Sequence, residues 1–264
     1  MTETDTPAVP SDETDRQFVT ALARGLDLLG CFGPEDRYLS NNEFARRTGL
    51  ARPTVSRLTY TLTRTGHLVR DEVSGEYRLG AKVLQLGFAT LGGMSIGERA
   101  DDVLADLSRG PNPYVTAAIA ERSGTRAVYL ARRRSRQAVS LSMDVGARLP
   151  LFYSGIGRAI LAGMTDSARN EVLRLAIAEF PDQKDRMTQS LAEAQRDFET
   201  YGYCTSFGRW KPEINAIAAP FRSLDGTTVY GLNIGGPSFL VSPEDLHAQY
   251  GTRLIDTVAA LGGR

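Results

Sequence analysis

Two helix patterns joined by a glycine turn fill residues 40–65, and this stretch constrains the fold more than any other part of the chain. A helix-turn-helix needs a small residue where its second helix crosses the first, a turn residue that tolerates positive φ, and a branched apolar residue facing back. Ala45, Gly49 and Val55 stand where these three are needed. The other apolar positions of the pair recur at helical spacing and are Phe44, Leu50, Leu58 and Leu62. The stretch therefore predicts a helix-turn-helix.

The opposite side of the second helix carries cationic and hydroxyl side chains. We call this set the recognition face, and its members are Arg52, Thr54, Ser56, Arg57, Tyr60 and Thr61. Such side chains, gathered at the start of one helix, are typical of a helix that enters the major groove of DNA. The alternative is an ordinary amphipathic hairpin with a solvated charged face, which has no need of this cluster. We expect the recognition face to contact an operator.

Two strand patterns follow at residues 67–70 and 76–79, and Gly75 supplies a turn residue between them. Helix, helix and hairpin together predict a winged helix-turn-helix over residues 16–80. Arg70 and Arg78 of the wing are expected to contact the DNA backbone, although three acidic residues beside them limit such contacts. A further pattern at residues 18–31, with Leu22, Leu26 and Leu29, predicts a first helix that supports the pair.

Charge is unevenly distributed along this formally neutral chain. Residues 16–92 hold 11 bases and 7 acids, whereas residues 1–15 hold five acids and no base. We expect the first fifteen residues to form a disordered tail. Residues 40–66 contain five arginines and one acid, so we expect contact with DNA phosphates and salt-dependent binding to double-stranded DNA.

The remainder predicts a linker helix over residues 81–93 and an effector-binding and oligomerisation domain over residues 94–264. Strand patterns occupy residues 114–120, 127–131, 139–143, 203–207, 214–220 and 229–234, and helix patterns occupy residues 95–108, 154–163, 166–178, 188–201 and the stretch after Ser242. We expect a mixed α/β sheet covered by helices, which makes the whole chain α+β. For the arginine-rich run at residues 132–136, a solvated turn or an oligomer contact is favoured over a nucleic-acid site.

Several classes of protein are disfavoured. No signal peptide and no apolar run long enough to span a membrane is evident, so we expect a cytoplasmic protein with no membrane partner. The two cysteines form no CxxC spacing, and Cys204 is interpreted as a core residue rather than a pocket residue. With only two histidines and no nucleophile–base pair, we expect no metal, no cofactor and no enzyme activity.

Taken in order, several segments resemble the IclR family of bacterial transcriptional regulators from about residue 16 to residue 261. They are ALARGLDLLGCF, YRLGAKVLQLG, RLPLFYSGIGRAILA, AIAAP and VYGLNIGGP. The resemblance implies an N-terminal DNA-binding domain, a linker helix and a GAF-like effector domain, assembled as a homodimer or a dimer of dimers. Its SGIGR segment resembles regulators of aromatic-acid breakdown. The chain departs from the family at residues 206–211, where many members have an acidic cluster.

An effector site is expected at the start of the helix over residues 154–163. Ser154 is a good N-cap, and Gly155 and Gly157 would leave the first turn open, so that its N–H groups and positive dipole end accept a carboxylate. The positions matched to the family's pocket are Ser154, Gly155, Ile156, Ser206, Ile214, Ala216, Asn233 and Gly235. The amide of Asn233 needs partners if buried, either from a ligand or from a neighbouring loop. Trp210 and Phe207 either wall an aromatic ligand or fill core space.

The sequence thus favours a ligand-responsive DNA-binding regulator, a repressor or an activator, that senses a small organic acid of aromatic type. Two alternatives remain. In one, the C-terminal domain of a DNA-binding regulator only oligomerises; in the other, the domain is an enzyme that acts on a small acid. A change in operator affinity caused by an effector would separate the first from the favoured function, and turnover of a candidate ligand would support the second.

Overall fold

The computed structural model describes residues 17–33, 35–93, 97–137, 139, 141 and 143–262, and it describes no side chain between residues 91 and 99. The chain divides into two compact units, Met1–Thr90 and Leu91–Arg264, which are treated separately below. Within the described residues, no helix has the length and the apolar composition that crossing a membrane requires.

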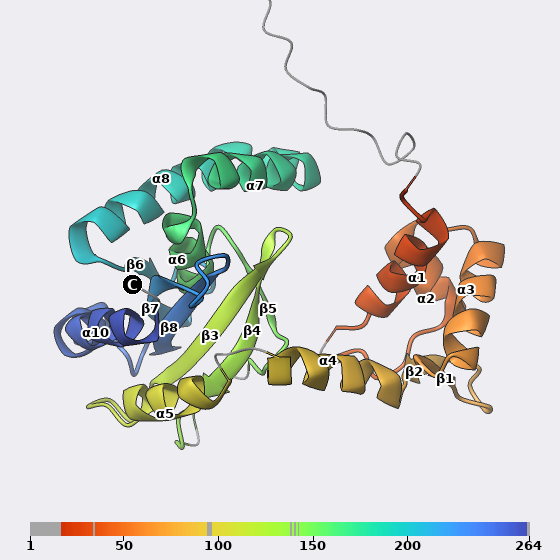
Figure 1. Ribbon diagram of the computed structural model, residues 1–264, viewed down its shortest axis with the longest axis horizontal. Coiled ribbons are helices and arrows are strands. Elements are labelled where there is room, and N and C mark those ends of the chain that lie inside the picture. Colours follow the sequence, from red (N-terminus) through yellow and green to blue (C-terminus); the bar gives the residue numbers. More distant parts are fainter. Residues whose placement is uncertain are drawn as a thin grey trace, which may run out of the picture. The chain divides into compact units, whose positions relative to one another are not determined.

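The first unit is a winged helix-turn-helix (Figure 1). Its elements are α1 (Thr20–Gly30), α2 (Asn41–Thr48), α3 (Arg52–Arg64), β1 (Leu68–Arg70), β2 (Tyr77–Leu79) and the first residues of α4 (Ala81–Gly93). Strands β1 and β2 pair antiparallel, and a bridge between Leu39 and Tyr77 adds a third segment to this small sheet. The winged helix predicted from the sequence is confirmed.

Local signals explain the two helices of the motif. The Ser40 hydroxyl accepts a hydrogen bond from the Glu43 backbone N–H, which caps α2 at its amino end. Gly49 ends α2 with a φ of 71°, a conformation that favours glycine. The hydroxyl of buried Thr59 in α3 donates to the side-chain oxygen of Asn41 in α2 at 3.2 Å. These contacts fix the angle at which α3 leaves the turn.

The core of this unit is small, and it corrects the prediction for the first helix. Its fully buried apolar residues are Leu28, Leu39, Phe44, Val55, Leu68 and Tyr77. Gly25 and Leu28 form the inner side of α1, and both are buried against the rest of the unit. Leu22 and Leu26 instead lie on the outer side, 62% and 59% exposed. The prediction that these two leucines pack against the motif is wrong.

The second unit is a six-stranded sheet with helices on both faces. Its elements are α5 (Gly97–Ser108), β3 (Thr116–Ser123), β4 (Arg126–Arg133), β5 (Arg148–Pro150), α6 (Gly155–Gly163), α7 (Asp166–Glu179), η1 (Pro181–Gln183), α8 (Lys184–Tyr201), β6 (Cys204–Phe207), β7 (Ile214–Arg222), β8 (Val229–Pro237), α9 (Pro243–Asp245), the π-helical η2 (Leu246–Tyr250) and α10 (Gly251–Leu261). The strand order is β5-β4-β3-β8-β7-β6, and each neighbouring pair is antiparallel. The α+β class is confirmed, and the expected mixed sheet is wholly antiparallel.

One predicted strand is wrong. The expected strand at residues 139–143 lies partly outside the described residues, and its described members, Val139, Leu141 and Met143, belong to no strand. The edge next to β4 is taken by β5, which pairs Arg126 with Pro150. Before β5 the chain turns at Gly146, whose φ is 85° and whose N–H donates to the Tyr129 carbonyl. Apolar alternation alone misplaced the edge strand.

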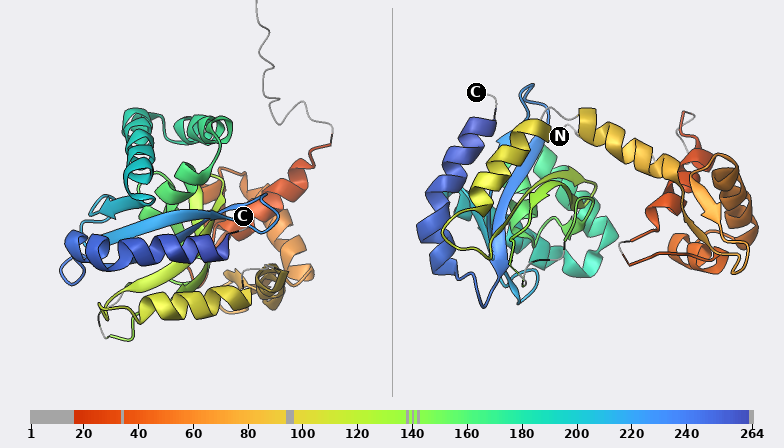
Figure 2. Two further views of the ribbon diagram at one scale, coloured as in Figure 1. Left: turned by 60° about the vertical axis from the view of Figure 1, so that its left-hand side comes forward. Right: turned by 90° about the horizontal axis from the view of Figure 1, so that it is seen from below.

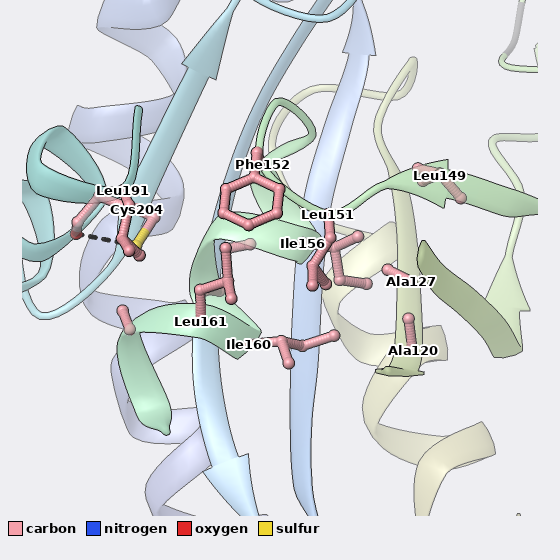
Figure 3. Packing of buried hydrophobic residues seen from close by; sticks show 14 of the residues in the cluster. Ala120, Ala127, Leu149, Leu151, Phe152, Ile156, Ile160, Leu161, Leu191 and Cys204 are labelled. Atoms are coloured by element: carbon pink, nitrogen blue, oxygen red, sulfur yellow. Dashed lines mark hydrogen bonds between the residues drawn. The ribbon is translucent and has the colours of Figure 1, made fainter. Parts of the chain in front are cut away.

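The two faces of the sheet support two separate cores (Figure 2). Alternate residues of β3 point to opposite faces: Ala117 and Ile119 lie beneath α5 and α10, whereas Ala118 and Ala120 lie beneath α6. The core around α6 also receives residues from α7, α8 and the segment before α6, and Figure 3 shows Phe152, Ile156, Leu161 and Cys204 among its buried side chains. Cys204 is fully buried there, as the core interpretation predicted. This layer surrounds the expected effector site.

Candidate DNA-binding and effector sites

Helix α3 presents the recognition face as its sequence pattern predicts for an amphipathic helix. Five of the six members are exposed, namely Arg52, Ser56, Arg57, Tyr60 and Thr61, and Thr54 is half-buried. On the inner side of the same helix, Val55 and Thr59 are fully buried. Side chains able to donate to phosphate oxygens and base edges therefore lie together on one accessible surface.

The start of α3 also leaves backbone donors available. Its N-cap residue is Ala51, which has no side-chain oxygen, so no side chain caps the first turn. Pro53 occupies a first-turn position, where its missing N–H costs nothing. The positive end of the helix dipole and uncapped amides favour an anion such as a DNA phosphate at this end.

The charge of the motif is concentrated on α3, because the arginines of α2 are paired. Arg47 donates to both carboxylate oxygens of Asp36, at 2.5 and 2.9 Å, and to Glu43 at 2.9 Å. Arg46 pairs with Glu43 as well, at 2.5 Å. These hydrogen bonds lower the pKa of Asp36 to about 2 and that of Glu43 to about 2. Among the described residues, Arg52 and Arg57 have no such acidic partner.

The wing carries Arg70 on β1 and Arg78 on β2, and both side chains are exposed. The turn between the strands is closed by Asp71, whose carboxylate accepts hydrogen bonds from the backbone N–H groups of Val73 and Ser74 and from the Ser74 hydroxyl. These bonds lower the pKa of Asp71 and hold a negative charge at the wing. The wing is therefore electrostatically mixed, in contrast to α3.

In the second unit, six of the eight expected effector residues line one cavity on the α6 side of the sheet. They are Ser154, Gly155, Ser206, Ile214, Ala216 and Asn233. Register explains the convergence, because Ser206 pairs with Ala216, and Ala218, two positions further along β7, pairs with Asn233. The cavity volume is about 20 Å³, roughly what one water molecule needs.

Two of the eight expected residues lie elsewhere. Ile156 points into the core, where its side chain fills the space left by the missing side chain of Gly231. Gly235 lies against Ala216 and the Asn215 carbonyl, where a Cβ would come within 2.8 Å of both. Neither residue lines the cavity. Each neighbours true lining residues in sequence, so helical and strand geometry turns it away.

The first turn of α6 is open on one side only. Gly155 faces the cavity, and a Cβ there would lie 3.4 Å from the Asn233 side-chain oxygen. Gly157 instead packs on Leu151, since a Cβ would approach the Leu151 carbonyl oxygen to 2.3 Å, so this glycine serves close packing and not ligand access. The Gly157 N–H donates to the capping Ser154 hydroxyl. No hydrogen bond within the described chain uses the N–H groups of Gly155 and Ile156.

The polar groups of the cavity differ in how far they are satisfied. The Ser206 hydroxyl donates to the Tyr153 carbonyl and the Ser154 hydroxyl donates to the Pro150 carbonyl, both at 2.8 Å. The Asn233 side chain is 5% exposed and makes no hydrogen bond to any described residue. The polar atoms of Asn233 are not among the fully buried, unpartnered atoms of the described chain, so they reach the cavity space and are available to a ligand.

Arg158, the last residue of the SGIGR segment, holds the walls of the cavity together from behind. It is 1% exposed and donates to Asp197 of α8 at 3.1 Å, and burial lowers its pKa. Asp197 also accepts from the backbone N–H and the hydroxyl of Thr205 on β6. One carboxylate thus joins α6, α8 and β6, the elements that carry Gly155 and Ser206.

Sequence reasoning missed part of the lining. The additional residues are Tyr129, Leu141, Met143 and Leu149, and Trp210 also lines the cavity. Leu141 and Met143 were missed because they lie in the wrongly predicted strand, and Tyr129 is the one aromatic residue of β4, a signal that could have been used. Phe207 packs against His247 on the other face of the sheet. Of the two open aromatic candidates, only Trp210 borders the cavity.

Comparison with known proteins agrees with these features. The IclR helix-turn-helix domain matches residues 21–72, and the C-terminal domain of bacterial transcriptional regulator IclR matches residues 88–261. A crystal structure of an IclR family transcriptional regulator from Brucella abortus is 38% identical, with a TM-score of 0.85, and the match covers 97% of this chain and 95% of that one.

Two further proteins are similar to this chain. The Pca regulon regulatory protein of Pseudomonas putida is 28% identical over 243 residues, which are 89% of this chain and 80% of that protein. An IclR homolog from Microbacterium hydrocarbonoxydans, whose crystal structure is a complex with 4-hydroxybenzoate, has the same fold at 22% identity and a TM-score of 0.64, covering 92% of this chain and 95% of that one. From the fold, the two sites and these matches, the chain belongs to the IclR family of bacterial transcriptional regulators.

Proposed function

We propose that a small organic acid of aromatic type binds in the α6 cavity and changes the affinity of this regulator for its operator. The observation that carries the proposal is Asn233, a buried residue whose amide has no described partner and lies beside the first turn of α6, where the N–H groups of Gly155 and Ile156 have no described acceptor. A carboxylate placed between them accepts from the N–H groups of Gly155 and Ile156, and from the Asn233 Nδ2 group once the amide, whose Oδ1 lies nearer Gly155, has rotated. The resulting hydrogen bonds satisfy three donors at once.

The walls of the cavity favour an aromatic body on that carboxylate. Tyr129 and Trp210 border it together with Leu141, Met143 and Leu149, so the ligand has two rings and several aliphatic side chains to contact. The Microbacterium hydrocarbonoxydans homolog, a protein of the same fold, is complexed with 4-hydroxybenzoate. Both facts support an acid of this class.

The small volume of the cavity suggests how binding is coupled to DNA. At about 20 Å³ the cavity is far too small for a benzoate-sized molecule. The ligand therefore binds a second state in which the lining has moved, and its differential affinity for the two states shifts their populations. We expect a coupling of about 1 to 3 kcal/mol between effector and operator.

DNA is bound, in this proposal, by the recognition face with α3 in the major groove. Arg57 and Thr54 contact base edges, and Arg52 contacts phosphate or a base edge near the helix start. Arg70 and Arg78 add backbone contacts from the wing. Arg57→Ala should weaken operator binding by about 1 to 3 kcal/mol if its guanidinium is bidentate to guanine, whereas Arg196→Ala on the exposed side of α8 should not.

The functional unit is a symmetric dimer or a dimer of dimers, because one winged helix covers only a half-site. The apolar residues of α4 lack partners within the described chain: Leu84, Leu86 and Phe88 are 62%, 59% and 64% exposed. A second copy of the chain covers this face in the proposed assembly. Sedimentation of micromolar protein should show a species well above the 28.7 kDa of one chain; a 28.7 kDa species alone would contradict the dimer.

The test of the function uses full-length protein and fluorescence anisotropy on operator DNA at one fixed salt concentration. 4-Hydroxybenzoate and benzoate are titrated in parallel with acetate, which has the carboxylate but no ring. An aromatic acid should shift operator affinity and raise the melting temperature, and acetate should do neither at the same concentration. If no acid alters operator affinity and none stabilises the protein, the second unit serves oligomerisation only.

A further inference from the structure

A second concave site lies in the second unit, on the face of the sheet opposite the effector cavity. It is formed where α5 ends and β4 runs out, and its volume is about 630 Å³, within the range of small-molecule sites. Its ten lining residues include no acid and five arginines, which are Arg109, Arg132, Arg133, Arg134 and Arg136. The effector cavity is uncharged by comparison, with no ionisable lining residue except Tyr129.

The arginine-rich run, for which the sequence favoured a solvated turn or an oligomer contact, exposes Arg133, Arg134 and Arg136 and is anchored by one buried residue. Ser135, in the middle of the run, is 5% exposed. Its hydroxyl donates to the Pro113 carbonyl at 2.6 Å and accepts from the Gln137 N–H at 3.1 Å, and its own N–H donates to the Thr116 hydroxyl. The residues on either side of Ser135 are thereby held at the rim of the pocket.

The guanidinium groups are only partly neutralised by the surrounding protein. Arg132 pairs with Asp144, and Arg133 pairs with Asp101 at 2.5 Å. Even so, the Nη1 atom of Arg132 is buried and has no hydrogen-bond partner in the described part of the chain. Arg109 and Arg136 are exposed at the same pocket and have no described ion pair. A buried guanidinium donor without a described acceptor, beside further cations without a described ion pair, favours an anionic ligand in this pocket.

We propose that this α5–β4 pocket binds a small ligand carrying two or more phosphate groups. The guanidinium fork matches the oxygens of a phosphate, and several forks around one pocket suit an anion with more than one charge. A monocarboxylate engages one fork and leaves the others unused. A nucleic-acid duplex meets a protein along an extended surface, and a concave pocket of this volume fits a compact anion better.

The test is calorimetric titration of the full-length protein with inorganic pyrophosphate at about 0.1 M salt, where distant surface charges are largely screened. We expect saturable binding of one pyrophosphate per chain, with weaker binding of orthophosphate. The variant Arg109→Gln/Arg136→Gln should lower the affinity about tenfold or more, because each guanidinium makes charge-assisted hydrogen bonds. The matched control, Arg174→Gln/Arg196→Gln, removes the same charge from exposed positions on α7 and α8 and should bind as the parent does.

Several results overturn the proposal. Absence of saturable binding at millimolar pyrophosphate would do so, as would equal losses in the two double variants, which indicate a general charge effect. Orthophosphate binding as tightly as pyrophosphate would indicate a site for one phosphate. Non-operator duplex DNA that competes with pyrophosphate through Arg109 and Arg136 would assign the pocket to nucleic acid. Binding of 4-hydroxybenzoate is measured on the same variants and is independent of this site, so the effector proposal stands or fails separately.

Discussion

The recognition face and the effector cavity place their functional groups in opposite settings. The recognition face is a single exposed helix side, and five of its six side chains reach solvent. The effector cavity collects its lining from the start of α6, from the five strands β4 to β8 and from Leu141, Met143 and Trp210, and it encloses about 20 Å³. The first is available to DNA as it stands, whereas the second must expand before it can hold an aromatic acid.

This difference indicates which features would determine DNA binding at the first site and ligand binding at the second. On α3, the exposed side chains and the backbone N–H groups of the first turn are solvated, so in the proposed complex DNA replaces their water without a rearrangement of the helix. In the cavity, Asn233 is 5% exposed and the first turn of α6 is buried, so a ligand must fit the lining as well as accept hydrogen bonds from it. Four predictions test the contrast, from the largest expected effect to the smallest.

The largest difference between the two units is expected when a buried side chain is truncated in each of them. Phe44 of α2 is fully buried, and its ring packs edge-on against Phe32 with centroids 5.6 Å apart. Phe44→Ala should cost about 3 to 5 kcal/mol, which is a large part of the stability of a domain with so small a core. We expect operator binding to be lost and effector binding to persist.

The matched variant for that comparison is Leu254→Ala in α10, which removes a fully buried side chain from the larger unit. Its cost of about 2 to 5 kcal/mol falls on a sheet with a core on each face. Circular dichroism melts and calorimetry with 4-hydroxybenzoate should show a lower melting temperature but retained ligand binding. Operator affinity unchanged in Phe44→Ala would show that the first unit does not depend on its own core.

Two buried asparagines on neighbouring strands give the second prediction. The Asn215 amide donates to the Val241 carbonyl at 3.0 Å, whereas Asn233 has no described partner. Asn215→Leu should therefore destabilise the protein by about 1 to 3 kcal/mol, since it leaves a buried carbonyl unsatisfied. Asn233→Leu should leave the free energy of unfolding unchanged or raise it, and it should abolish the response to 4-hydroxybenzoate without changing operator affinity.

Urea unfolding and calorimetry together decide this comparison. Asn233→Leu that loses stability as Asn215→Leu does would assign Asn233 a structural role. Tight binding of the effector by Asn233→Leu would remove β8 from the site. These outcomes address the alternative that the sequence left open, in which Asn233 bonds a neighbouring loop.

The exposed helix and the enclosed cavity also differ in how much of each could be predicted from the sequence. The turn at Gly49 and the buried Val55 could be predicted because helical periodicity and positive φ are local properties. For α1, helical periodicity is compatible with either of two sides facing the core. The side with Leu22 and Leu26 was predicted, whereas Gly25 and Leu28 are buried. The correct side depends on the position of the neighbouring helix, which no local pattern contains.

The lining residues of the cavity could be predicted only where a local sequence feature determines the position of the residue. Ser154 was recognisable as an N-cap, and it caps α6 as expected. Tyr129 was missed because its contact with the cavity depends on the pairing of β4 with β3 across a register shift at Ile119 and Ala120. Met143 was missed because apolar alternation was taken for a strand. Register and loop path are long-range properties, so the resemblance to the family contributed more than the pattern did.

The third prediction concerns Trp210, which sequence reasoning left as either a ligand wall or core filler. It lines the cavity, and its loop is tied down by an ion pair between Arg209 and Glu193 at 2.5 Å. Trp210→Ala should lower the affinity for 4-hydroxybenzoate by about 0.5 to 1.5 kcal/mol through loss of ring contact. It should also speed association, because the cavity becomes larger before the ligand arrives.

The association and dissociation rates of the ligand are best measured by surface plasmon resonance, because Trp210→Ala removes the single tryptophan on which intrinsic fluorescence would depend. Phe239→Ala, which removes an aromatic ring that is 72% exposed and outside the cavity, serves as the control. Unchanged affinity and unchanged rates in Trp210→Ala would show that the indole contacts only protein. Operator affinity in the absence of ligand should be unchanged in both variants.

The smallest effect is expected in the first unit, where exposed ion pairs orient α2. Asp36 accepts two hydrogen bonds from Arg47, which lower its pKa from 3.8 to about 2. Because the folded-state pKa is lowered, the pair stabilises the fold above about pH 3.8 and loses this contribution as the pH falls toward 2. Asp36→Asn should therefore lower the melting temperature slightly at neutral pH, and the difference from the parent should shrink between pH 4 and pH 2.

Glu72→Gln on the wing removes an exposed acid without a described ion pair and should show no such trend. A difference between Asp36→Asn and the parent that stays constant down to pH 2 would mean that the carboxylate does not stabilise α2 through its charge, and that the orientation of α3 depends instead on the buried contacts of Thr59 and Val55.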